Sequence, residues 1–415
     1  MNVKDTDHLI AELSDEYETT SNLKEADLIL LNTCSVREKP VAKMFSEIGV
    51  FKKNKKPDAK IGVCGCTASH MGKEIIQKAP IVDFVLGARN VSRIKEALST
   101  PKAVITDIDY DDTTYIFKGH RTNPYKDYVN IMVGCDKKCS FCIVPQTRGK
   151  EISIPMDIII SQIEKLVKDG VKEITLLGQN VNNYGKRFSI PHEKVNFTKL
   201  LQEVSKIDGV ERIRFTSPHP LHADDEFIEE FSSNPKICKY IHFPLQSGST
   251  KLLQSMKRGY TKEWFLNRIE KLRKIPDITI STDIIVGFPG ETEEDFEDTL
   301  EVVEKSGFEQ MFSFVYSPRP LTTAKDFENQ IDKETAKQRL HKLQNLQRKI
   351  LEEKAKLQIN KIYDVLIDKY EDGIISGKSD NFYSVRSKGD KSLLGKIVKI
   401  KITSNHHSSL NGELV

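Results

Sequence analysis

Three cysteines in one short stretch are the residues of this sequence best suited to metal chemistry. The stretch Gly134-Cys-Asp-Lys-Lys-Cys-Ser-Phe-Cys142 has the spacing C-x3-C-x2-C and directly follows an apolar run. Its thiols are Cys135, Cys139 and Cys142. One loop with this spacing can supply thiolates to three corners of a 4Fe–4S cube. Three ligands leave the fourth iron open to another molecule, so we predict a catalytic cluster.

A structural zinc site is the alternative use of these three cysteines. Zinc sites favour four ligands, often as two C-x2-C pairs, and no further cysteine or histidine lies within the stretch. The spacing is instead typical of the radical S-adenosylmethionine (SAM) superfamily. There the open iron binds the amino and carboxylate groups of SAM, and an electron from the cluster cleaves the sulfonium. Phe141, before the last cysteine, is expected to shield the cluster from solvent.

Two further stretches fit the same chemistry. Thr282-Asp-Ile-Ile-Val-Gly-Phe-Pro-Gly-Glu291 is an apolar run that ends in a glycine-rich turn, where backbone can approach a ligand closely. Leu176-Leu-Gly-Gln-Asn180 ends another apolar run. Either turn alone is weak support for SAM binding. Together with the cysteine loop, both turns are expected to contact SAM. The candidate SAM contacts are Gln179, Asn180, Gln246, Gly287 and Glu291.

A second group of cysteines lies earlier in the chain. Cys34 and Cys66 each follow a predicted strand. The carboxyl ends of strands in an open α/β sheet are where ligands gather. From the residues alone, two buried thiols of a Rossmann-like domain remain an equal alternative. Cys238 is expected to be a buried thiol.

Alternating strands and helices must position these residues. Before the connector expected at 107–123, strands are predicted at 27–33, 60–63 and 82–86, with a helix at 41–52. A second α/β series has strands at 128–133, 173–177, 212–215, 240–243, 279–286 and 310–315, and helices at 157–169, 261–274 and 293–305. Such a series builds a full or a partial barrel. A long amphipathic helix at 333–358 and a small β-barrel of about five strands follow.

Composition limits the class of protein further. The chain has 415 residues and a formal net charge of +3, so any RNA-binding surface must be local. No apolar run reaches the length of a membrane span, and no signal peptide opens the sequence, so we expect a cytoplasmic protein that contacts no membrane. His219 and His242 are expected to be structural rather than catalytic.

The whole chain resembles the tRNA methylthiotransferases of the radical SAM superfamily. The wording is closest to the MiaB branch, which makes 2-methylthio-dimethylallyladenosine in tRNA. The segments that carry the resemblance are Asn32-Thr-Cys-Ser-Val-Arg-Glu-Lys39, Gly65-Cys-Thr-Ala68, Met256-Lys-Arg-Gly-Tyr-Thr261 and Tyr316-Ser-Pro-Arg-Pro320.

The resemblance implies three domains. They are a Rossmann-like methylthiotransferase domain at 1–106, a partial (β/α) barrel radical SAM core at 121–354, and a small RNA-binding β-barrel, the TRAM domain, at 357–415. It also implies a second, auxiliary 4Fe–4S cluster with Cys34 and Cys66 as two of its three ligands. The third ligand normally precedes a Met-Asn that corresponds to Met1-Asn2, so we expect the first strand to be missing and the natural start to lie upstream. Cys64 is an extra thiol.

The implied reaction uses two SAM molecules. One methylates a sulfur on the auxiliary cluster. The other is cleaved at the Cys135 cluster, and the resulting radical removes hydrogen from carbon 2 of the adenine ring, where the methylthio group is placed. The implied partners are the tRNA anticodon stem-loop and an electron donor such as flavodoxin or ferredoxin, and we expect a monomer.

Three alternatives stay open at this point. The same chemistry could act on threonylcarbamoyladenosine in tRNA or on an aspartate of a ribosomal protein, although the Ser-Val-Arg-Glu-Lys wording favours the isopentenyl substrate. A non-catalytic tRNA-binding protein with relic clusters predicts no 5′-deoxyadenosine on reduction with SAM. A zinc-dependent RNA-binding module predicts bound zinc and no iron.

Overall fold

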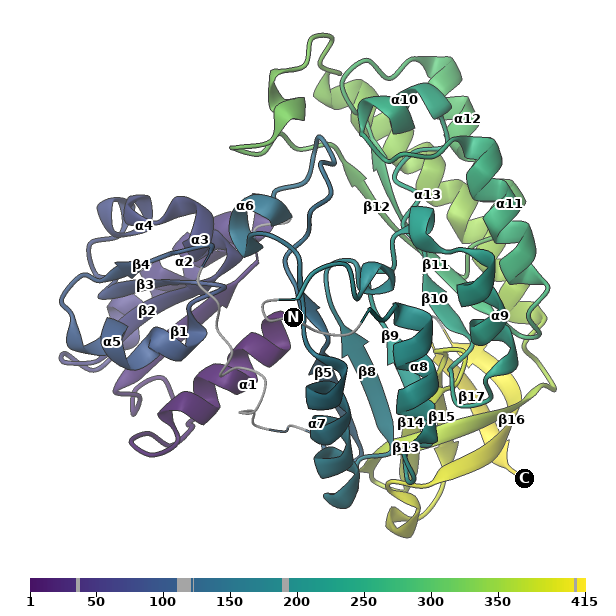
Figure 1. Cartoon of the computed structure of the whole chain (residues 1–415), viewed down its shortest axis with the longest axis horizontal. Coiled ribbons are helices and arrows are strands. Elements are labelled where there is room, and N and C mark those ends of the chain that lie inside the picture. The colour runs from purple at the N-terminus through teal and green to yellow at the C-terminus, as the bar shows by residue number, and fades with distance from the viewer. Residues whose placement is uncertain (35–37, 110–120, 122, 189–193, 407–408) are drawn as a thin grey trace.

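The chain folds into three parts that follow one another along the sequence (Figure 1). The computed structural model describes residues 1–34, 38–109, 121, 123–188, 194–406 and 409–415. Most of the predicted connector at 107–123, and residues 35–37 of the Asn32–Lys39 segment, lie outside these ranges. No helix within them is both long and apolar enough to cross a bilayer.

The first part is a parallel sheet with helices on both faces. Its strands run in the order β1 (Leu28–Thr33), β2 (Lys60–Gly65), β3 (Phe84–Gly87) and β4 (Val104–Ile105). Its helices are α1 (Asn2–Leu13), α2 (Glu38–Asn54), α3 (Cys66–Met71), α4 (Lys73–Lys78) and α5 (Ile94–Ser99). One apolar core lies under α1 and α5 and the other under α2 and α4. Burial on both faces explains why the strands are almost continuously apolar.

The second part is a partial barrel of six parallel strands, which decides between the full and partial barrels expected above. One sheet contains β5 (Lys126–Asn130), β8 (Glu173–Leu177) and β9 (Arg212–Phe215), and the other contains β10 (Tyr240–His242), β11 (Thr279–Val286) and β12 (Gln310–Val315). A bridge between Ile213 and Ile237 joins the sheets. Within the described ranges β5 and β12 do not pair, so they form the two edges.

The predicted strand at 128–133 is wrong in one respect, because it is two strands. β5 ends at Asn130, and β6 (Met132–Val133) pairs antiparallel with β7 (Ile152–Ser153). Ile131 still donates its N–H to the Leu177 carbonyl of β8 at 2.9 Å, whereas its own carbonyl accepts from Ile154 at 2.9 Å. The chain therefore leaves the barrel at Ile131 and enters the cysteine loop in a new direction.

Helices cover the outside of the barrel. They are α7 (Met156–Lys168), α8 (Phe197–Lys206), α9 (Asp225–Ser233), α10 (Thr250–Ser255), α11 (Lys262–Arg273), α12 (Glu293–Ser306) and α13 (Lys333–Lys356). The short helix α6 (Val144–Arg148) instead contacts α3 of the first part. Helix α12 begins at a capping box in which Thr292 and Asp295 satisfy each other's backbone N–H groups. Helix α13 begins at Asp332, whose side chain accepts from two backbone N–H groups.

The third part is the expected small barrel. Its strands are β13 (Ile362–Glu371), β14 (Ile374–Ser379), β15 (Ser384–Lys388), β16 (Ile397–His406) and β17 (Ser409–Leu414), closed in the order β13-β14-β15-β17-β16. Strand β14 contains Gly377, Lys378 and Ser379, which have low strand propensity. Its strand register is instead set by pairing with β13 and β15.

A buried charge cluster joins this small barrel to the base of the core. Arg214 of β9 donates from Nη1 to the carbonyl of Asp380 at 2.9 Å and from Nη2 to that of Ser379 at 2.7 Å. Arg212 makes two further bonds of this kind, and Glu173 of β8 lies 3.0 Å from Arg214 Nε. The side chains of Glu173, Arg212 and Arg214 are all buried. Each charge has lost its water, and the opposite charges nearby offset that cost.

Arg214→Met should therefore destabilise the chain. It leaves Glu173 as a buried carboxylate with only Arg212 near it, and two barrel carbonyls lose their donors. We expect the free energy of unfolding to fall by about 3–5 kcal/mol, measured by denaturant unfolding. Arg268→Met is the matched control, because Arg268 pairs with the exposed Asp225 and should cost less than about 1 kcal/mol. Equal losses in the two variants would contradict this role.

Candidate active site

The cysteine loop leaves β6 through a turn that only glycine can make. Gly134 has φ of +77°, and a Cβ on it would lie 2.1 Å from the carbonyl oxygen of Lys150. The N–H of Cys135 donates to the Gly149 carbonyl at 3.2 Å. The first cysteine is thereby held against the strand that returns from the loop.

The middle of the loop is attached to the opposite side of the core. Ser140 donates from its N–H to the Met256 carbonyl at 3.2 Å and from Oγ to the Ser255 carbonyl at 2.9 Å. Its own carbonyl accepts from Ala324 at 2.9 Å. Phe141 packs with Met256 and the other side chains of a small apolar cluster. This packing agrees with the shielding expected of Phe141.

Burial makes the thiols of the loop unfavourable as free thiolates. Cys135 and Cys139 are each 9% exposed, and Cys142 is half-buried. Desolvation raises the pKa of Cys135 to about 12 and that of Cys142 to about 11. Thiolates in such a place need positive charge beside them, which ligated iron provides. The donor set therefore fits an iron–sulfur cluster.

The described residues contain no group of three His, Cys, Asp or Glu side chains that converge on a single metal ion. A cluster takes its thiolates at separate iron corners, so its ligands need not meet at one point.

Arg258 supplies a second positive group at this loop. Its Nη1 lies 3.5 Å from Cys139 Sγ, and Nη2 donates to the Pro244 carbonyl at 2.9 Å. Its Nε donates to the Tyr260 hydroxyl at 3.1 Å. The sequence analysis missed this role. Arg258 lies in the Met256–Thr261 segment that was used only for the family resemblance, and nothing in its spacing points to the cysteines.

Unsatisfied polar atoms lie where SAM contacts were predicted. Both amide atoms of Gln179 and Oδ1 of Asn180 are shielded from solvent and have no hydrogen-bond partner among the described residues. Buried polar atoms of this kind require a ligand or water. Asn180 Nδ2 donates to Glu151 at 3.2 Å, and the Glu151 N–H donates to Asp136 of the cysteine loop at 3.0 Å. Asn180 is thus linked to the loop, and the unpartnered atoms of both amides fit the polar groups of SAM.

Gln246 lies in a strained segment against β11. Its φ is +77°, its N–H donates to the Asp283 carbonyl at 2.8 Å, and its carbonyl accepts from Ile285 at 2.9 Å. The residue is 9% exposed. Its contact with SAM stays a prediction, for which this held backbone is suitable.

Gly287 and Glu291 have partners within the chain. The Gly287 N–H donates to Glu291 Oε2 at 2.6 Å, and Arg339 Nη1 donates to the same carboxylate at 2.8 Å. A Cβ on Gly287 would lie 2.6 Å from Cβ of Ala336 in α13. The glycine is therefore required for packing against α13. That Gly287 and Glu291 contact SAM stays a prediction.

The second cysteine group lies at one edge of the N-terminal sheet, as expected. Thr33 and Gly65 are register partners in β1 and β2, so Cys34 and Cys66 leave neighbouring strand ends. Gly65 has φ of +92°, which brings its backbone against Thr33. Cys64 points into the apolar core instead, where burial raises its pKa to about 12. It is therefore not placed with the other two.

Helix α6 links the two cysteine groups. It begins at Val144, shortly after Cys142, and contacts α3, whose first residue is Cys66. Its last residue, Arg148, is buried, forms an ion pair with Asp5 of α1, and lies beside Cys66. Burial opposes the charge, but the carboxylate and the sulfur together raise the pKa of Arg148. The sequence analysis missed this arginine, because its partners are distant in the chain.

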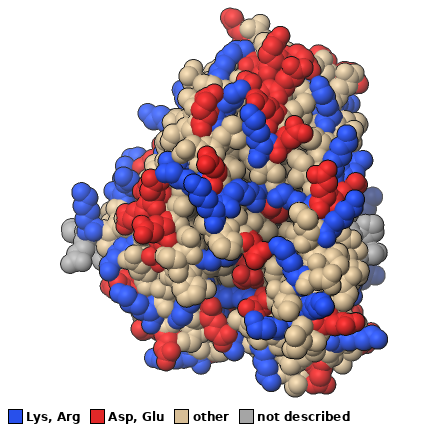
Figure 2. All heavy atoms as spheres, turned by 90° about the vertical axis from the view of Figure 1, so that its right-hand side faces the viewer, with Lys and Arg blue, Asp and Glu red and all other residues tan. Residues whose placement is uncertain are grey.

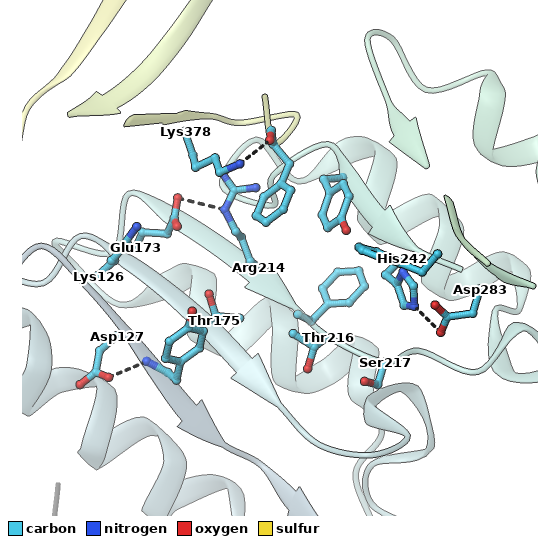
Figure 3. Close-up of a pocket in the computed structure, with 15 residues that line it drawn as sticks. Lys126, Asp127, Glu173, Thr175, Arg214, Thr216, Ser217, His242, Asp283 and Lys378 are labelled. Carbon is cyan, nitrogen blue, oxygen red and sulfur yellow. Dashed lines mark hydrogen bonds and ion pairs between the residues drawn. The ribbon is translucent and has the colours of Figure 1, made fainter. Parts of the chain in front are cut away.

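His219 is held in a turn, and the structural role expected of it stays a prediction, because its buried Nε2 has no hydrogen-bond partner among the described residues. Its Nδ1 accepts from the Leu221 N–H at 3.2 Å, and burial lowers its pKa, which keeps the ring neutral. His242 differs, because it lines a cavity inside the barrel together with Asp283 (Figure 3).

Gly134→Ala should prevent loading of the cluster. The new Cβ would meet the Lys150 carbonyl, so the turn must open and move Cys135, at a cost of about 3 kcal/mol. Iron and sulfide content after anaerobic reconstitution measures the effect. Gly170→Ala is the control, since Gly170 has φ of +91° but open space around it. It should cost about 1 kcal/mol and keep its iron. Normal iron content in Gly134→Ala would refute the role of the turn.

Comparison with known proteins agrees with this geometry. Among solved structures, the cobalamin- and 4Fe–4S-bound radical SAM methyltransferase TsrM from Kitasatospora setae matches with a TM-score of 0.55 and 15% identity, over 77% of this chain and 70% of that one. At this identity the match concerns the fold alone. Family models match at residues 129–303, for the radical SAM superfamily, and at residues 1–87, for Uncharacterized protein family UPF0004.

Full-length relatives are much closer in sequence. Proteins named tRNA-2-methylthio-N(6)-dimethylallyladenosine synthase from a Nitratiruptor species and from Sulfurimonas denitrificans are 61% identical over all of this chain and 97% and 96% of their own lengths. The protein of that name from Campylobacter jejuni is 58% identical over all of this chain and 97% of its length. The chain therefore belongs to the family of tRNA-2-methylthio-N(6)-dimethylallyladenosine synthases.

Proposed function

We propose that this chain places a methylthio group on carbon 2 of N(6)-dimethylallyladenosine at position 37 of tRNA. The observation that carries the proposal is identity near 60% along the whole chain to relatives named for this product, combined with a radical SAM cysteine loop. An aromatic carbon–hydrogen bond is too inert for acid–base chemistry, which is why a radical enzyme is required.

The cysteines divide into two sets with different tasks. Cys135, Cys139 and Cys142 hold the cluster that meets SAM, and Cys34 and Cys66 are two ligands of the auxiliary cluster. When bound, the clusters supply the electron that cleaves SAM and the sulfur that is transferred. Around them the chain excludes water and fixes the sulfurs.

Positive charge and packing tune the first set. Arg258 donates from Nη1 toward Cys139 Sγ, and a charged donor of this kind can strengthen the hydrogen bond to a sulfur ligand. Phe141 packs over the loop and keeps solvent away. Both effects lower the cost of holding ionised sulfur in the interior.

SAM is oriented by amides at the ends of the barrel strands. Gln179 and Asn180 offer donors and acceptors that lack intrachain partners, and Glu151 holds Asn180 in place. Gln246 offers a fixed backbone beside β11. Gly287 and Glu291 shape the turn that follows β11, and we retain them as contacts to the adenosyl end of SAM.

The three parts have separate roles in this proposal. Residues 1–106 hold the auxiliary cluster, residues 121–354 catalyse the radical reaction, and residues 357–415 form the TRAM domain, which binds the anticodon stem-loop. Figure 2 shows Lys and Arg mixed with Asp and Glu over most of one face, with acidic side chains gathered at the top of the view and no broad basic patch. RNA contact then depends on local groups. We further propose a cytoplasmic monomer reduced by a flavodoxin- or ferredoxin-type donor.

Substitution of single cysteines should separate the two sets. Cys139→Ala is expected to abolish 5′-deoxyadenosine formation from SAM and dithionite. Cys34→Ala and Cys66→Ala should retain 5′-deoxyadenosine formation but yield no methylthiolated nucleoside, because only sulfur delivery is lost. Liquid chromatography with mass spectrometry measures both products.

Cys238→Ala is the matched control for these variants. Cys238 is buried in the core away from both groups and should retain both activities. Loss of 5′-deoxyadenosine in Cys34→Ala, or its persistence in Cys139→Ala, would show that the assignment of ligands is incorrect.

Deletion of the gene should remove one nucleoside from cellular tRNA. We expect 2-methylthio-N(6)-dimethylallyladenosine to disappear and N(6)-dimethylallyladenosine to accumulate in its place. Mass spectrometry of digested tRNA makes the comparison, with the complemented strain as control. If a methylthiolated threonylcarbamoyladenosine disappears instead, the substrate is the alternative one.

A further inference from the structure

A cavity of about 530 Å³ lies inside the partial barrel, between the predicted SAM contacts and the TRAM barrel (Figure 3). This volume is in the range of small-ligand sites. Strands β5, β8, β9, β10, β11 and β12 contribute side chains to its wall, and Lys378 and Phe382 of the TRAM barrel close one end. Phe382 stacks on Tyr240 with ring centroids 4.2 Å apart, so that end is firmly packed.

The cavity continues toward the site of SAM cleavage. Thr216 and Ser217 line it directly after the end of β9, at the end of the strands where the cysteine loop leaves the barrel. Asp283 lines it from β11, and the carbonyl of Asp283 accepts the Gln246 N–H. A ligand in the cavity would therefore lie next to the segment that is predicted to hold SAM.

Two exposed aromatic side chains mark its open side. Tyr128 is on β5 and is 40% exposed, and Phe312 is on β12 and is 39% exposed. These strands are the two unpaired edges of the partial barrel. Exposed aromatic rings at the entrance of a cavity are suited to stack on a base that has left its own helix stack.

The charges of the lining cancel. Three basic side chains face three carboxylates: Lys126, Arg214 and Lys378 against Asp127, Glu173 and Asp283. Most of them are already paired, as Arg214 is with Glu173 and Asp127 with Lys4 at 2.9 Å. A phosphate would find no net positive field here. The lining favours a neutral ring with apolar surface.

The carboxylate of Asp283 is the polar group in the lining that can recognise such a ring. His242 bonds through Nδ1 to Ser281 Oγ at 2.8 Å and through Nε2 to Asp283 Oδ2 at 3.1 Å (Figure 3). Among the described residues no hydrogen bond reaches Oδ1 of Asp283. A carboxylate oxygen accepts hydrogen bonds only, so this atom is suited to an N–H donor. An N(6)-alkylated adenine has one exocyclic N–H.

We propose that the cavity takes the extruded N(6)-alkylated adenine base of the tRNA. Tyr128 and Phe312 stack against the ring and its alkyl group, and Asp283, held by His242, accepts the exocyclic N–H. The proposal rests on the proposed function and names the residues that recognise its substrate. It makes Tyr128 and Phe312 determinants of specificity for the alkyl group, and Asp283 a determinant for adenine.

Equilibrium binding tests this assignment without catalysis. The probe is a synthetic anticodon stem-loop with either adenosine or N(6)-dimethylallyladenosine at position 37, titrated with the reconstituted full chain without reductant or SAM at one fixed salt concentration. The wild type should bind the alkylated hairpin at least tenfold more tightly, because five additional carbons become buried and two buried carbons already account for roughly tenfold.

Substitutions then show which residues of the cavity cause the preference for the alkylated hairpin. Phe312→Ala and Tyr128→Ala should each weaken binding of the alkylated hairpin by about tenfold and reduce its advantage over the unmodified one. Asp283→Leu should weaken both hairpins by a similar factor and keep their ratio, since both bases have an exocyclic N–H. Tyr17→Ala is the control, because Tyr17 is 36% exposed in the N-terminal part and should change neither constant.

The outcomes separate this inference from the proposed function. If folded Phe312→Ala and Tyr128→Ala both bind the alkylated hairpin within twofold of the wild type, the cavity is not the base site, even where product is formed. If the preference for the alkylated hairpin follows these residues, the assignment holds even in preparations that form no product. Thermal melting verifies that each variant is folded.

Discussion

Ionised sulfur in a protein interior needs positive charge beside it, and much of this structure meets that need. Desolvation raises the pKa of Cys135 and Cys142, so these thiols would stay protonated without a partner. A bound iron–sulfur cluster would be that partner, and Arg258 adds a fixed cation at Cys139. The turn at Gly134 and the bonds of Ser140 hold the sulfurs in place before iron arrives.

Two buried arginines pair with carboxylates in the same way at the interfaces between the parts of the chain. Arg148 connects the core to the N-terminal part through Asp5 and lies beside Cys66. Arg214 connects the base of the core to the small C-terminal barrel through backbone carbonyls, with Glu173 as its counter-ion. The barrel interior lies between these interfaces. The walls of its cavity come from the strands of the core and from Lys378 and Phe382 of the small C-terminal barrel.

Local sequence patterns predicted most of the fold. The strands at 173–177, 212–215, 279–286 and 310–315 have the bounds expected from their short runs rich in β-branched and aromatic residues. Cys34 and Cys66 lie at one sheet edge because parallel strands end together. The break of the strand at Ile131 was missed, because tertiary contacts redirect the chain there. Arg148, Glu151 and Arg258 were missed for the same reason, since each acts through partners far away in the sequence. The cavity depends on Phe382, which belongs to another part of the chain.

Electron paramagnetic resonance of the reduced, anaerobically reconstituted Cys34→Ala/Cys66→Ala double variant tests the central claim most directly. Only the cluster of Cys135, Cys139 and Cys142 can contribute to its spectrum. Three thiolates with one open iron predict that addition of SAM changes the g-values, because the cofactor becomes a ligand of that iron. A spectrum that is the same with and without SAM, or a preparation that binds no iron, would contradict the account.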